Sequence, residues 1–86
     1  MQKTAKHFNV VKNGKLTIRV QSIIDRYKNN GVDVVKVFEL ERMRLNDKLI
    51  TAEVFEDSEY GKTLEPVSYI KAKIQALTEI LSVLNS

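Results

Sequence analysis

Cysteine is absent from the chain, and histidine, proline and glycine are scarce, with one, one and three copies among 86 residues. Without cysteine there can be no disulfide, no thiolate metal ligand and no cysteine nucleophile. His7 alone cannot build a multi-histidine metal site, and three scattered glycines supply no phosphate-binding loop. The acidic residues 56–59 lack the spacing of a calcium-binding loop. We therefore expect no metal, no cofactor and no enzymatic activity.

Long hydrophobic runs are also missing. No segment is apolar for long enough to form the core of a signal peptide or to span a membrane. The sequence therefore predicts a cytoplasmic protein that does not associate with membranes. A chain of 86 residues has too little interior for two hydrophobic cores, which favours one domain over residues 1–86.

Acidic residues are absent from the first quarter of the chain. The first acid is Asp25, although the net charge of the whole chain is only +3. The preceding segment contains five basic residues, namely Lys3, Lys6, Lys12, Lys15 and Arg19. The positive charge is therefore concentrated near the N-terminus, whereas residues 25–86 contain more acids than bases.

A first β-hairpin is predicted around Asn13-Gly14. This pair tolerates the positive φ angles of a two-residue type I′ turn, and residues 8–12 and 15–20 flank it as strands. In the second strand, alternate residues would point to one face: Leu16, Ile18 and Val20.

The segment after Val20 supports two interpretations. Apolar residues at i, i+3, i+4 and i+7 predict a short helix over residues 22–29, which Asn30-Gly31 would end. Alternatively the strand continues, because Ile23 and Ile24 are β-branched and the helix would have barely two turns.

A second hairpin is predicted over residues 32–54. β-Branched residues begin the segment, Ile50 to Val54 alternates between apolar and polar, and Asn46-Asp47-Lys48 could form a three-residue loop. Residues 39–44 are good helix formers and argue against it. The strand also needs a β-bulge, since Val34-Val35 puts two apolar residues in succession. Residues 56–65 are acidic and turn-rich, and indicate a surface loop.

The clearest pattern lies at the C-terminus. Pro66 suits the start of a helix, and apolar residues follow at alternating spacings of three and four up to Leu84. The predicted fold is α+β: an antiparallel four-stranded sheet made of two hairpins, a short middle helix as one alternative, and a long amphipathic C-terminal helix.

The C-terminal helix also predicts a homodimer. It carries two apolar rows, and one face of a small sheet covers only one. We expect the dimer interface to use the heptad residues Ile70, Ile74, Leu77, Leu81 and Leu84.

The basic first hairpin suggests binding of single-stranded DNA or RNA. Cations track phosphates, and an aromatic ring beside them can stack on a base. The candidate residues are Lys6, Phe8, Lys12, Lys15 and Arg19. The order of elements is similar in layout to small single-stranded-DNA-binding transcription-cofactor domains, and this similarity implies pairing through the C-terminal helices. The alternative is a protein-interaction or regulatory accessory protein without affinity for nucleic acid.

Overall fold

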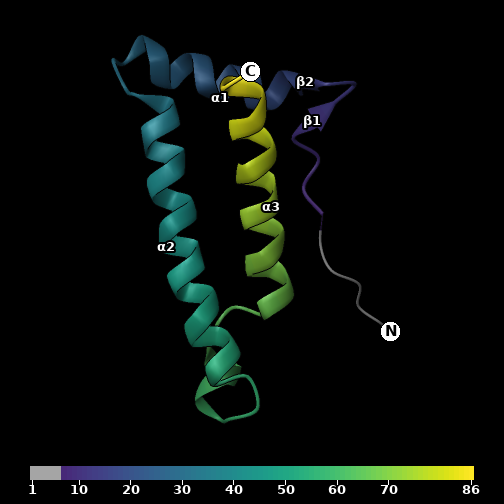
Figure 1. The fold of residues 1–86 in the computed structure, drawn as a ribbon, viewed down its shortest axis with the longest axis vertical. Coiled ribbons are helices and arrows are strands. Elements are labelled where there is room, and N and C mark those ends of the chain that lie inside the picture. Colours follow the sequence, from purple (N-terminus) through teal and green to yellow (C-terminus); the bar gives the residue numbers. More distant parts are fainter. Residues whose placement is uncertain (1–6) are drawn as a thin grey trace.

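The computed structural model describes residues 7–86, which form three α-helices and one two-stranded antiparallel sheet (Figure 1). The elements in chain order are β1 (Val11–Lys12), β2 (Lys15–Leu16), α1 (Ile18–Asn29), α2 (Val34–Val54), the 3-10 helix η1 (Tyr60–Thr63) and α3 (Val67–Leu84). The prediction of an α+β fold with a four-stranded sheet is therefore wrong. The described part of the chain is mainly helical.

The first hairpin is confirmed, although its strands are short. Asn13 and Gly14 have φ angles of 55° and 77°, as a type I′ turn requires. Val11 pairs with Leu16 and Lys12 with Lys15. The strand then ends at Leu16 instead of Val20, because Thr17 caps a helix: its hydroxyl accepts the backbone N–H of Val20 at 3.4 Å.

The helix after the hairpin is therefore longer than residues 22–29. It begins at Ile18, and this removes Ile18 from the inward-facing strand row in which the sequence placed it. Ile18 is 91% exposed in the structure. Ile24 is the one residue of α1 that is fully buried.

The second predicted hairpin is also wrong, because residues 34–54 form the single 21-residue helix α2. The Asp33 side chain accepts the backbone N–H of Lys36 at 3.2 Å and starts the helix. No glycine or proline follows before its end, and the expected loop at Asn46-Asp47-Lys48 lies inside it. The helical period also removes the need for a bulge, since it places Val34, Leu45 and Ala52 together on one buried face.

The C-terminal helix is confirmed. α3 runs from Val67 to Leu84 and directly follows Pro66. It packs along α2 in an antiparallel helical hairpin, and α1 crosses the end of this hairpin (Figure 1). The connecting loop is tightened at Gly61, where a Cβ would lie 1.8 Å from the carbonyl oxygen of Phe55. Only glycine fits at that position.

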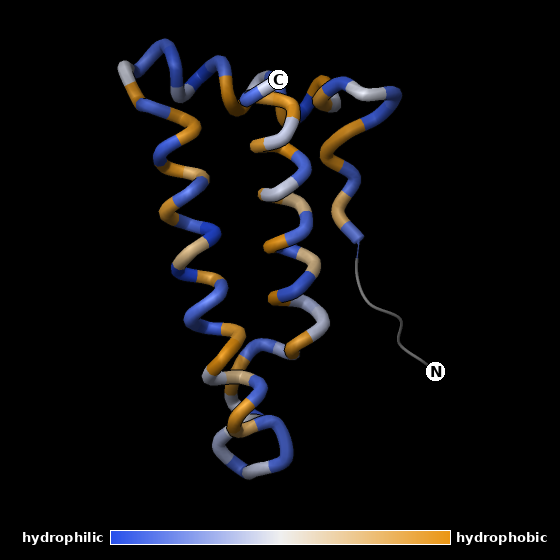
Figure 2. Tube along the Cα trace, in the orientation of Figure 1, coloured by the Kyte–Doolittle hydropathy of each residue, from blue (hydrophilic) through white to orange (hydrophobic). Residues whose placement is uncertain are grey.

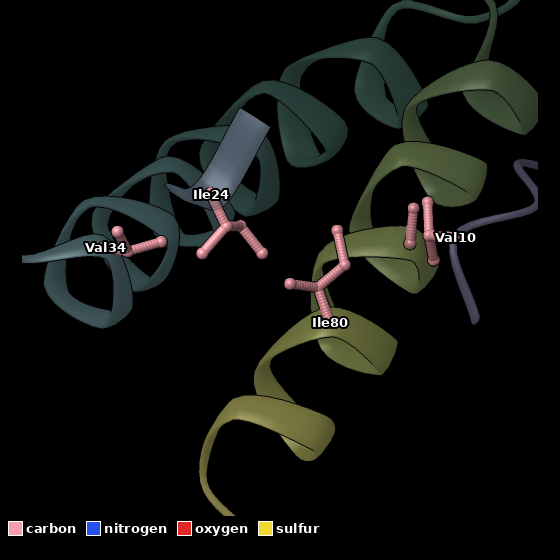
Figure 3. Packing of buried hydrophobic residues seen from close by; sticks show 5 residues of the cluster. Val10, Ile24, Val34 and Ile80 are labelled. Carbon is pink, nitrogen blue, oxygen red and sulfur yellow. The ribbon is translucent and has the colours of Figure 1, made fainter. Parts of the chain in front are cut away.

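Two hydrophobic clusters hold the helices together. At the α1 end, Ile24, Val34 and Ile80 meet from three different helices, and Val10 joins them from the segment before β1 (Figure 3). Nearer the other end, Leu45 and Ala52 of α2 pack against Ile70 of α3. The core therefore lies between helices, with the small sheet attached to α3.

Candidate functional site

The hairpin and the start of α1 bring three cations together at one end of the molecule. Lys12 and Lys15 are directly opposed across the two strands, and Arg19 lies in the first turn of α1, four residues after Lys15. All three side chains are exposed, and none forms an ion pair within residues 7–86. We call Lys12, Lys15 and Arg19 the basic end.

The acidic loop lies at the opposite end of the long axis. Residues 56–59 follow α2, whose 21 residues span about 30 Å from the end where α1 crosses (Figure 1). Electrostatic screening at physiological salt has a length of about 8 Å. The loop carboxylates are therefore several screening lengths away and do not neutralise the potential of the basic end.

The aromatic residue predicted to stack on a base is occupied elsewhere. Phe8 is half-buried and packs against Tyr69 of α3, with the ring centroids 5.7 Å apart. The Lys73 ammonium also lies over the Tyr69 ring, 4.6 Å from its centroid. Phe8 therefore contributes to attaching the N-terminal segment to α3. Lys6, the remaining predicted binding residue, lies outside the described residues.

The residues predicted for a dimer interface face the interior of the single chain. Ile70 and Leu81 are buried, and their partly buried neighbours Ile74, Leu77 and Leu84 pack against the two core clusters. The dimer prediction assumes that a small sheet covers only one of the two apolar rows of α3. That assumption no longer applies, because α2, α1 and the hairpin cover α3.

A different apolar surface emerges on α2, on the side away from α3. We call it the outer stripe, and its members are 41–70% exposed: Val37, Leu40, Met43, Ile50 and Val54. Apolar residues recur along the whole of α2 in Figure 2, whereas α1 is mostly hydrophilic. The stripe does not stand out in the sequence, because its helical spacing is visible only when residues 34–54 are read as one helix.

Ion pairs connect α2, α3 and the loop between them. The Glu65 carboxylate accepts hydrogen bonds from Lys48 of α2 and, at 2.7 Å, from Lys73 of α3. These two bonds, that of Lys48 first, lower the pKa of Glu65. The Arg44 guanidinium donates to Glu41 at 2.9 and 2.5 Å and lowers the pKa of that carboxyl. Glu65 therefore fastens the start of α3 to α2.

The single histidine lies in an open depression. His7 is exposed, and Glu56, Lys71 and Gln75 line the same depression. Within residues 7–86, no three His, Asp or Glu side chains are grouped closely enough to hold a metal ion.

None of the helices in residues 7–86 combines the length and apolar character needed to cross a membrane.

Comparisons with known proteins find no relative of this chain. No protein-family profile, curated protein sequence or solved structure matches this chain. The layout similarity to single-stranded-DNA-binding cofactor domains also loses its basis, because it depended on a strand meander that residues 32–54 do not form.

Proposed function

We propose that the protein is a non-enzymatic binding module that holds single-stranded nucleic acid at the basic end. The observation behind this proposal is the exposure of Lys12, Lys15 and Arg19 without an ion-pairing partner among residues 7–86. Phosphates attract such cations by releasing condensed counterions, and this attraction needs no buried pocket. The remote position of the acidic loop supports the same conclusion.

The proposal relies on the cations rather than on base stacking. Since Phe8 packs on Tyr69, the binding should depend on phosphate contacts and show little preference for sequence. Three phosphate contacts predict that log affinity for a single strand falls with log salt by a slope of about 2.

We expect the triple variant Lys12→Gln, Lys15→Gln, Arg19→Gln to bind a single-stranded oligonucleotide at least about tenfold more weakly at about 50 mM salt. Its salt slope should approach zero. Fluorescence anisotropy at several salt concentrations measures both quantities, with double-stranded DNA and single-stranded RNA as parallel probes.

The matched control removes the same charge elsewhere, through Arg42→Gln, Lys62→Gln and Lys71→Gln, which are outside the basic end. This variant should bind within about twofold of the native protein, apart from the general effect of net charge. Failure of the native protein to bind at about 50 mM salt, or equal losses in both variants, would contradict the proposal.

A protein-interaction role is the second candidate, and the outer stripe of α2 favours it. Extended apolar surface is uncommon on a soluble monomer and marks contact surfaces. This role requires no contact with nucleic acid, so a native protein that binds no oligonucleotide would still be compatible with it.

A further inference from the structure

Helix α2 presents apolar side chains on two opposite faces. Its inner face, with Val34, Leu45 and Ala52, is buried against the rest of the chain. Met43, Ile50 and Val54 of the outer stripe lie about half a helical turn away, and the stripe winds back from them to Val37 near the edge of the inner face, over about 25 Å of helix. Nothing within residues 7–86 covers this stripe, since its members remain 41–70% exposed.

The size of the stripe distinguishes it from scattered exposed aliphatic residues. The five half-exposed side chains together present on the order of 500 Å² of apolar surface, at the upper end of what ordinary monomers carry. Two such stripes in contact would bury about 1,000 Å², which is the lower limit for a specific protein interface. A second copy of the chain therefore supplies enough area for a weak but specific pair.

We infer that the outer stripe is covered by the outer stripe of a second copy, with the two α2 helices antiparallel. The charges at the two ends of α2 favour this orientation. Lys36 lies at the beginning of the stripe and is exposed, and the acidic residues 56–59 follow its end. A parallel pair would place each of them opposite the same charge in the partner, which opposes association.

Antiparallel pairing about the middle of the stripe removes these repulsions. It moves the two Lys36 side chains about 28 Å apart along the helices. Ile50 then lies near the second copy's Leu40.

The same arrangement brings opposite ends of the two molecules together. The acidic residues 56–59 follow α2, while Lys28 and Lys36 lie near its beginning. In an antiparallel pair each acidic loop approaches the other copy's cations, which favours encounter and orientation. α3 separates α2 from the hairpin (Figure 1), so the basic end stays free. The dimer is thus independent of the proposed binding of nucleic acid.

Sedimentation of the native protein and two matched variants tests the pairing. We expect reversible dimerisation with a dissociation constant in the micromolar range, about what a small interface supports. Ile50→Glu should weaken dimerisation about 100-fold, since it puts a carboxylate opposite Leu40. Ile18→Glu changes the same residue type at a 91% exposed site outside α2 and should leave dimerisation unchanged. Circular dichroism of each variant verifies that it is folded.

Disulfide trapping tests the orientation, because the chain has no cysteine of its own. Lys36→Cys and Val54→Cys chains are mixed and oxidised, and the products are separated by mass. An antiparallel pair joins position 36 to position 54, whereas two copies of position 36 lie about 28 Å apart and stay unlinked. Products joining 36 to 36 and 54 to 54 would overturn the antiparallel arrangement.

Sedimentation also decides whether a second copy is the occupant at all. A native protein that stays monomeric at about 100 µM overturns the inference, and so does a native dimer that Ile50→Glu leaves intact. Binding of a monomeric protein to lipid vesicles through the stripe would assign the surface to a membrane instead. None of these outcomes affects the oligonucleotide titration, so the two proposals fail separately.

Discussion

Replacing Asp47 by proline should destabilise the protein by about 3 kcal/mol or more, a large part of the total stability of a domain of this size. Residue 47 lies in the interior of the 21-residue helix α2. Proline there removes a backbone hydrogen bond to the preceding turn, and its ring collides with the carbonyl group four residues earlier. Urea unfolding followed by circular dichroism measures the loss, at a fixed low protein concentration because the proposed dimerisation would add stability by mass action.

Asp47→Ala is the control for the loss of the carboxylate. Alanine is the better helix former, so this variant should be as stable as the native protein or slightly more stable. The pair of variants also separates the helix from the hairpin that the sequence suggested. In a loop at residues 46–48, proline would be tolerated and alanine would bring no gain. A proline variant within about 0.5 kcal/mol of the native protein would contradict the continuous helix.

Ile24→Ala should cost about 2–5 kcal/mol, the usual range for a fully buried isoleucine. Ile24 has no exposed surface, and it contacts Val34 and Ile80 where three helices meet (Figure 3). It is also the one fully buried residue of α1, so its truncation removes the main attachment of this helix. The midpoint of urea unfolding should fall strongly, with hydrogen exchange in α1 rising first.

The adjacent isoleucine provides a matched control. Ile23 is 36% exposed, so Ile23→Ala removes the same atoms from a site that water already reaches. We expect this change to cost less than about 1 kcal/mol. Equal losses at positions 23 and 24 would mean that α1 packs through a different face.

Local rules predicted two elements of the fold correctly. Asn13-Gly14 requires positive φ at two successive residues, and few residue pairs tolerate this, so the turn could be placed from the sequence. α3 follows Pro66 and continues with apolar residues at the helical period up to Leu84. In both cases a short-range preference and the tertiary structure favour the same conformation.

The same rules failed over residues 32–54. The alternation of Ile50, Ala52 and Val54 is typical of a strand, but Ala52 alone of the three is buried, on the inner face of α2. Ile50 and Val54 belong to the outer stripe. Short alternating patterns arise by chance inside a helix that is apolar on two faces, and only packing against α3 shows which residues are inside.

The candidate sites, too, have some features that could be predicted from the sequence and others that only the structure shows. The absence of acids before Asp25 could be read from the sequence, and the hairpin turn places Lys12 opposite Lys15 with Arg19 one helical turn later. Only the structure shows that Phe8 is occupied by Tyr69 and that the apolar rows of α3 lie inside the chain.

The sequence by itself determined the Asn13-Gly14 turn, the C-terminal helix and the position of the cations, because each depends on residues close together in the chain. The tertiary structure decided which apolar residues form the core and which remain on the surface. This choice depends on contacts between α2 and α3, whose residues are separated by the loop and cannot be paired from local patterns. A chain this short fills its core with one face of α2, and for that reason the outer stripe stays exposed.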